Sequence, residues 1–126
     1  LHANNPRDAL ARLETMVSMA NLHLPEQGVR RQIASAINLL IHVSRLADGK
    51  RKVTRIAEIV GMETDVISLQ DLFVYDQEGL TPDGEVVGEF KATGVRPQAA
   101  ERLEAFGVEL SPLLFANNHT SGRRDR

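Results

Sequence analysis

The chain contains no cysteine and no tryptophan, and it has few aromatic side chains of any kind. The absence of cysteine excludes disulfide bonds, thiolate metal sites and a thiol nucleophile, and it is the usage expected in a reducing cytoplasm. Four phenylalanines and one tyrosine leave the core to aliphatic side chains. With 126 residues, the chain is long enough for one domain of ordinary size, built around a thin aliphatic core.

Long apolar runs and an excess of one charge sign are missing as well. No stretch approaches the roughly 20 apolar residues of a membrane-spanning helix, and the N-terminus lacks the charged and apolar regions of a signal peptide. Fifteen Lys and Arg against seventeen Asp and Glu give a net charge of −2, which argues against nucleic acid as the main partner. We therefore expect a soluble protein, which is still able to dock on a membrane complex.

The motifs of several enzyme classes are also absent. A phosphate-binding loop needs Gly-x-x-x-x-Gly-Lys followed by Ser or Thr. Around Gly49-Lys50, Ser44 stands where the first glycine belongs and Arg51 replaces the hydroxyl residue. There is no Gly-x-Ser-x-Gly nucleophile motif. Three histidines have no metal-ligand spacing and are interpreted as ordinary residues, namely His23, His42 and His119.

The first part of the chain has clear helical signals. Asn5 is a suitable N-cap, Pro6 fits the first helical position, and Asp8 lies three residues after the cap, as in a capping box. One apolar stripe then follows at helical spacing, formed by Ala9, Leu10, Leu13, Met16, Val17 and Ala20. A second helix is expected after Pro25, with Val29, Ile33, Ala36 and Ile37 on one face.

Strand-like patterns follow the helices. The expected elements are a β-hairpin from 39–43 and 51–60, strands at 65–75 and 85–92, and a last helix from Pro97 to Gly107. Asp48-Gly49-Lys50 and Thr81-Pro82-Asp83-Gly84 have the residue types of turns. The polar, basic residues 117–126 are expected to be disordered.

Residues 54–67 allow a different interpretation, as a helix-turn-helix. Ala57, Gly61 and Ile67 have the spacing of that motif's small residue, turn glycine and packing residue, and a basic stretch precedes them. Against it, the second helix would be acidic and rich in β-branched and aromatic residues, which favour a strand. A small interaction or DNA-binding module is therefore the alternative to the interpretation that follows.

The opening residues carry a resemblance to a known family. The run Leu1-His2-Ala3-Asn4-Asn5-Pro6-Arg7-Asp8-Ala9 resembles the end of the histidine box of type II/IV secretion ATPases. The similarity is strongest to the CpaF/TadA ATPases of tight-adherence pili, whose box closes on Leu/Ile-His-Ala-Asn-Ser-Pro-Arg-Asp-Ala. Here Asn5 replaces the serine and keeps the ability to cap a helix. The resemblance covers nearly the whole chain, through Gln32-Ile33-Ala34-Ser35-Ala36, Ser44-Arg45-Leu46, Gly61-Met62-Glu63, Leu69-Gln70-Asp71-Leu72-Phe73 and Ala92-Thr93-Gly94-Val95-Arg96-Pro97.

This resemblance implies an α/β fold. Residues 1–60 would be the C-terminal part of a RecA-like ATPase domain, and residues 61–116 a β-rich, family-specific extension with a final short helix. The intact protein would be a cytoplasmic homo-hexamer, peripheral at the inner membrane, that couples hydrolysis of ATP with Mg²⁺ to pilus assembly or protein export through membrane platform proteins. The phosphate-binding loop would lie upstream of Leu1, so these residues alone are expected to be inactive.

The resemblance also selects four site residues. His2 matches the second histidine of the box and would lie at the end of a core strand, near the γ-phosphate, where an imidazole can donate a hydrogen bond. Arg12, Gln32 and Arg45 match family positions. Arg12 and Arg45 are candidates for subunit contacts, and Gln32 is a candidate for a hydrogen bond between secondary elements. The alternative for His2 is a strand-end residue bonded only to backbone, and the alternative for the other three is a side chain that only contacts water on a helix or hairpin surface.

Overall fold

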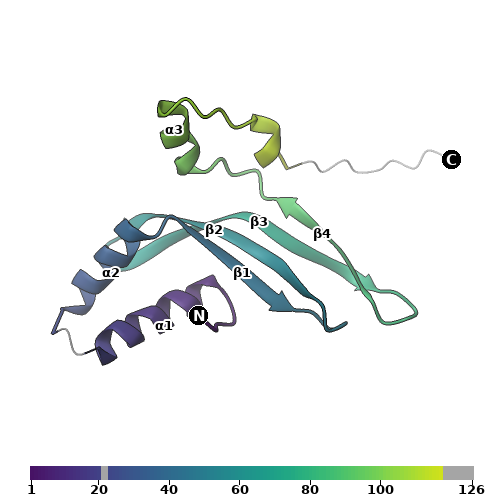
Figure 1. Ribbon diagram of the computed structural model, residues 1–126, viewed down its shortest axis with the longest axis horizontal. Coiled ribbons are helices and arrows are strands. Elements are labelled where there is room, and N and C mark those ends of the chain that lie inside the picture. The colour runs from purple at the N-terminus through teal and green to yellow at the C-terminus, as the bar shows by residue number, and fades with distance from the viewer. Residues whose placement is uncertain (21–22, 118–126) are drawn as a thin grey trace.

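The computed structural model describes residues 1–20 and 23–117, which form helices on both sides of one sheet. The helices are α1 (Pro6–Met19), α2 (Glu26–Ala36), α3 (Gln98–Ala105) and the short 3-10 helix η1 (Pro112–Phe115). The strands are β1 (Leu39–Arg45), β2 (Arg51–Glu63), β3 (Val66–Leu80) and β4 (Val86–Ala92). They pair antiparallel in chain order. Helices α1 and α2 lie along one face of the sheet, and α3 and η1 lie over the other (Figure 1).

The expected first hairpin is confirmed, and strands β1, β2 and β3 are longer than predicted. The β1–β2 turn is closed by a hydrogen bond from the Leu46 amide to the Lys50 carbonyl oxygen at 2.8 Å, with Gly49 at φ 81°. Strand β3 continues past residue 75 through a polar stretch, because β4 pairs with it as far as Leu80 opposite Val86. Cross-strand pairing therefore extends β3 beyond the end of its apolar pattern.

The helix-turn-helix alternative for residues 54–67 is wrong. These residues form most of β2, a tight turn at Thr64-Asp65 and the start of β3. Ile59 lies opposite Leu69, so β-branched and apolar side chains face each other across the two strands. Gly61, which would have been the turn glycine, lies at a register shift inside β2 with φ 135°, a backbone conformation that favours glycine.

The predicted cap of α1 is confirmed. The Asn5 side chain accepts a hydrogen bond from the Asp8 amide at 2.8 Å, and the Asp8 carboxylate accepts one from the Asn4 amide at 2.9 Å. The apolar stripe is only partly covered. Leu10 is buried and Val17 packs against the core, whereas Met16 is 55% exposed. The expectation from the stripe that Leu10, Met16 and Val17 all find partners inside the chain is therefore wrong for Met16.

The apolar core lies between the sheet and helices α1 and α2. Its buried members come from both helices and from the two central strands, namely Leu10, Val29, Ile33, Ile59 and Ile67. All are aliphatic, as the composition predicted. Burial of these side chains joins the first two helices to the β2–β3 hairpin.

A buried carboxylate holds α3 on the opposite face. Glu58 is 1% exposed, and its two side-chain oxygens accept hydrogen bonds from the amides of Gln98 and Ala99 at 2.8 and 2.9 Å and from the Gln70 side chain at 2.8 Å. Successive residues of a strand point to opposite faces, so Glu58 contacts α3 while the adjacent Ile59 contacts the core. The negative charge also complements the N-terminal end of α3.

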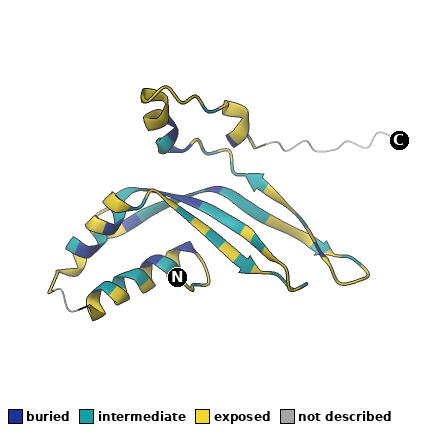
Figure 2. Ribbon diagram, in the orientation of Figure 1, coloured by how far each residue is buried: buried dark blue, intermediate teal, exposed yellow. Residues whose placement is uncertain are grey.

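The aromatic side chains extend this second layer. The Phe73 ring stacks on Phe90 with centroids 5.5 Å apart, and the Phe115 ring of η1 lies against Phe73 at 6.0 Å. Much of the outer surface of α3 and η1 is exposed (Figure 2). Phe106, directly after α3, is 86% exposed.

The expected domain divisions stay predictions. The boundary between residues 60 and 61 falls inside β2. Strand β2 pairs with β1 over residues 51–58 and with β3 over residues 55–63. The described strands are antiparallel, and the assignment to a RecA-like domain also stays a prediction. The tail expected to be disordered lies outside the described residues except for Asn117, and His119 lies outside them too.

Candidate functional site

An open hollow of about 430 Å³ lies where the N-terminal segment meets the first hairpin. Its lining residues come from three short stretches: Leu1, His2 and Ala3, then Ile41, His42, Val43 and Arg45, then Arg51. The side chains of His2, Arg45 and Arg51 are exposed and carry N–H groups able to donate hydrogen bonds. One end of the hollow is therefore rich in donors, and β1 supplies an apolar wall.

The β1–β2 hairpin positions the two arginines. Arg45 is the last residue of β1 and Arg51 the first of β2, and they are directly opposite in the antiparallel register. Residues opposite each other in such a pair project from the same face, with Cβ atoms about 4.5–5.5 Å apart. The short turn between them fixes this register.

The N-terminal segment brings His2 to the same place. The cap formed by Asn5 fixes the start of α1, and the residues before it lie next to β1, where Leu1, His2 and Ala3 line the hollow with Ile41 and Val43. Strand β1 is at the edge of the described sheet. His2 was expected at a strand end, but residues 1–3 have no strand pairing in the described part of the chain.

The acidic groups near the hairpin turn are already engaged with other partners. Asp48 accepts hydrogen bonds from the Val86 amide at 2.9 Å and the Lys50 amide at 3.0 Å. These two backbone donors stabilise the carboxylate and lower the pKa of Asp48 below its ordinary value. Glu85 pairs with the Lys50 side chain at 3.5 Å. Within the described residues, Arg45 and Arg51 form no ion pair with a carboxylate.

Two of the four predicted site residues share this hollow, and two do not. His2 and Arg45 both line it. Arg12 is on the exposed side of α1, 55% exposed, with its guanidinium 3.8 Å from Asp8. Gln32 is exposed on α2, and its side chain makes no hydrogen bond to the parts of the chain that the structure describes. Contacts between secondary elements, which were considered for Gln32, are thus not seen within those parts.

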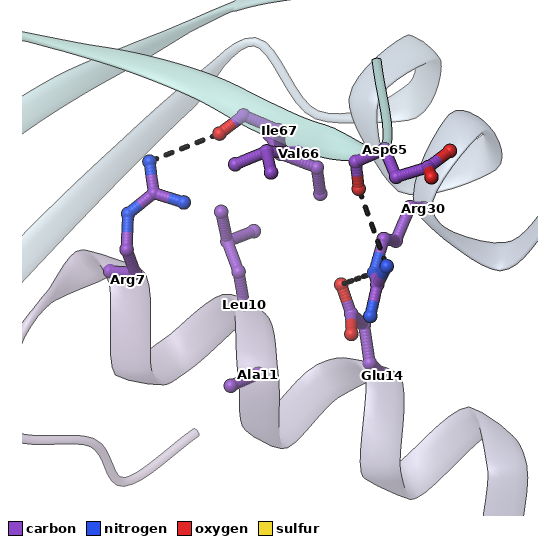
Figure 3. A pocket seen from close by; sticks show the side chains of 8 residues that line it. All are labelled: Arg7, Leu10, Ala11, Glu14, Arg30, Asp65, Val66 and Ile67. Carbon is purple, nitrogen blue, oxygen red and sulfur yellow. Dashed lines mark hydrogen bonds and ion pairs between the residues drawn. The ribbon is translucent and has the colours of Figure 1, made fainter. Parts of the chain in front are cut away.

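A second hollow, of about 240 Å³, lies between α1 and the start of β3 (Figure 3). The Arg7 guanidinium donates to the Ile67 carbonyl oxygen at 3.0 Å, and Arg30 donates to Glu14 at 3.0 Å and to the Asp65 carbonyl oxygen at 3.3 Å. Both arginines point at strand backbone or at a carboxylate (Figure 3). Their donors hold α1 and α2 to the β2–β3 turn, which is a structural role.

Sequence reasoning missed two residues that the structure makes prominent. Arg51 was noted only for standing where a hydroxyl residue would be needed, yet a hairpin closing around Gly49 already pairs it with Arg45. Glu58 was passed over, although a lone acid inside the apolar run 56–60 is an unusual residue to bury. Both signals are visible in the sequence once the strands are assigned.

Among residues 1–20 and 23–117, no helix is both long and apolar enough to cross a membrane. No three His, Asp or Glu side chains within these residues come together in a way that could hold a metal ion.

The chain has detectable similarity to known proteins over part of its length. It is 35% identical over 57 residues to a protein of Mycobacterium tuberculosis strain CDC 1551 / Oshkosh and to one of strain ATCC 25618 / H37Rv, each named "Putative conjugal transfer protein". The matched stretch covers 45% of this chain and 16% of each relative. No protein-family model matches the chain.

Proposed function

We propose that the chain is the C-terminal segment of a hexameric ATPase of the CpaF/TadA type, which couples ATP hydrolysis to pilus assembly or protein export. The observation that carries this proposal is the similarity to the mycobacterial conjugal transfer proteins. Conjugal transfer is a form of secretion, and the histidine-box resemblance leads to secretion ATPases. The two similarities agree on a role in secretion, and the resemblance adds the finer assignment.

The arrangement around residue 2 supports the proposal. His2 is exposed, lies three residues before Asn5, the cap of α1, and lines a hollow with Arg45 and Arg51. A histidine in such a place can donate to a phosphate oxygen or orient a water molecule. In the intact protein, this chain would contribute the histidine and subunit contacts to a cytoplasmic homo-hexamer, peripheral at the inner membrane and docked on platform proteins.

The residues of this chain do not by themselves fit ATP with Mg²⁺. The Gly49-Lys50 pair belongs to a hairpin turn, and the Lys50 ammonium pairs with Glu85. A phosphate-binding loop instead wraps successive backbone amides around the phosphates. We therefore derive no hydrolytic step from this chain alone, and we expect the 126 residues to show no magnesium-dependent ATP turnover. Turnover that chelation abolishes would contradict this expectation.

The decisive experiment uses the longer protein that the proposal implies, and it has two stages. The sequence encoded upstream of Leu1 must contain a phosphate-binding loop, and its absence would end the proposal. His2→Ala in that protein should then lower the rate of hydrolysis about ten- to a hundredfold, since one hydrogen bond to a charged group is worth about 1.5–3 kcal/mol. Nucleotide affinity should change much less, because the loop supplies most of the binding.

Two further variants help to interpret the result of His2→Ala. His2→Gln keeps an N–H donor and should recover part of the rate. His23 is also exposed and has φ 48°, so His23→Asn is a control histidine replacement by a residue that tolerates this backbone, and its rate should equal that of the unaltered protein. Unchanged turnover and secretion in His2→Ala would remove the catalytic role of His2.

A further inference from the structure

The two arginines at the open end of the first hairpin are an unusual pair. Arg45 and Arg51 are directly opposite on β1 and β2, and both are exposed. Like charges placed directly opposite each other destabilise an antiparallel pair. Lys50 and Lys52 flank Arg51 in the sequence, but Lys50 pairs with Glu85 and the Lys52 ammonium lies 5.3 Å from the centre of the Tyr75 ring. Arrangements that reduce the stability of the fold occur at functional sites. Binding of a ligand of opposite charge would remove the repulsion there.

No carboxylate in the described residues neutralises this pair. Asp48, the acid of the adjoining turn, accepts from two backbone amides, and Glu85 pairs with Lys50. The nearby carboxylates therefore bind groups of the turn and of the start of β4, and not the two arginines. The guanidinium groups of Arg45 and Arg51 are left facing a hollow that His2 also lines.

We propose that Arg45, Arg51 and His2 form a binding site for a phosphate group. The planar fork of a guanidinium matches the oxygens of phosphate, and two such forks together satisfy a dianion better than lysine point charges do. The apolar wall made by Ile41 and Val43, which are 62% and 52% exposed, gives room for an uncharged part of the same ligand. The inference rests on the proposed function only in naming a nucleotide as the natural source of the phosphate.

The test measures binding of pyrophosphate to the 126-residue chain. Changes in amide chemical shifts in nuclear magnetic resonance spectra report the binding. Saturable shifts are expected at residues 1–3, 43–45 and 51, and an absence of binding would overturn the proposal. Arg45→Gln and Arg51→Gln should each weaken binding about tenfold, the effect of losing a hydrogen bond to a charged group. Arg45→Lys keeps the charge but not the fork, and it should lose part of the affinity.

A matched control separates a site from general electrostatic attraction. Arg31 is exposed on α2, and Arg31→Gln removes the same charge away from the hollow. Its binding should stay within about twofold of the unaltered chain. Equal weakening by Arg31→Gln and Arg51→Gln would overturn the proposal, because it would mean that only net charge matters.

Two more measurements identify the ligand and exclude a purely structural role. Tighter binding of ATP than of pyrophosphate, with shifts at Ile41, would identify a nucleotide, whereas equal binding would identify a free phosphate compound. Without ligand, Arg51→Gln should raise the melting temperature by relieving repulsion from Arg45. A lower melting temperature together with unchanged pyrophosphate binding would show that the pair is structural. Either result of this test leaves the proposed ATPase role to be judged separately by the rate measurement on His2.

Discussion

Helices α1 and α2 are attached to the sheet by buried aliphatic side chains, whereas the N-terminal end of α3 is held on the other face by one buried carboxylate. The contrast is sharpest within β2, where Ile59 belongs to the apolar core and the preceding Glu58 accepts three hydrogen bonds. Apolar contacts are tolerant of small shifts, while hydrogen bonds to a carboxylate depend on direction. The first attachment should therefore set stability, and the second should set where α3 begins.

The largest effect is expected in the apolar attachment. Ile33 is 6% exposed in the centre of the core, and Ile33→Ala should reduce the free energy of unfolding by about 2–5 kcal/mol, because it removes buried methyl groups and leaves a cavity. Urea denaturation measures this change. Met19→Ala is the matched truncation on α1 of a side chain that is 80% exposed, and its effect should stay within about 0.5 kcal/mol. A similar small loss for both variants would mean that this cluster does not stabilise the fold.

A smaller effect is expected in the polar attachment. Glu58→Gln replaces one acceptor oxygen with an amide group, so at least one of the donors at Gln98, Ala99 and Gln70 loses its partner. Leaving one buried donor unsatisfied costs about 1–3 kcal/mol. Hydrogen exchange should accelerate over residues 98–106 more than in β2 and β3.

The control for Glu58 is an acid of α3 itself. Glu101 is exposed in the first turn of that helix, and Glu101→Gln removes the same charge without exposing a buried donor. Exchange over 98–106 should be nearly unchanged. If Glu58→Gln left exchange there at the unaltered rate, α3 would be held by its apolar contacts alone, and the comparison between the two faces would fail.

Local patterns were enough to predict most of the described elements. The cap at Asn5, the turn at Gly49 and the end of the last helix near Gly107 all follow from residue types with definite backbone preferences. The end of β3 was missed because it depends on pairing with β4 rather than on its own polar sequence. Met16 was misjudged because helical periodicity tells which residues share a stripe but not how far the sheet beneath them extends.

The candidate site was predictable in part. His2 and Arg45 were chosen through the resemblance, and the structure brings both to one hollow. The position of Arg51 opposite Arg45 follows from the strand register, and the register follows from the length of the turn. Arg51 could therefore have been derived from the sequence. The role of Glu58 could not, because its amide partners lie far along the chain, at the start of α3. Contacts of this kind depend on the packed fold.

A second hydrogen-bonded carboxylate sharpens the comparison, because it differs from Glu58 mainly in burial. Asp48 also accepts from two backbone amides, those of Val86 and Lys50, but it lies at a surface turn. These bonds lower its pKa in the folded chain below the ordinary value of 3.8. A carboxyl group whose pKa falls on folding stabilises the fold above its unfolded pKa, and this contribution is lost as the pH falls through the folded pKa.

The smallest effect is therefore expected at this turn. Asp48→Asn should lower the melting temperature slightly near neutral pH, by less than Glu58→Gln does, because the asparagine side chain keeps one acceptor oxygen and water can satisfy the exposed Lys50 amide. The difference from the unaltered chain should shrink as the pH is brought below 3.8. Asp83→Asn, at an exposed aspartate of the other turn, should not reproduce this pattern. A difference that stays constant down to acidic pH would mean that the substitution at position 48 removes a contact independent of charge. The ionised carboxylate would then not be what joins the first hairpin to β4.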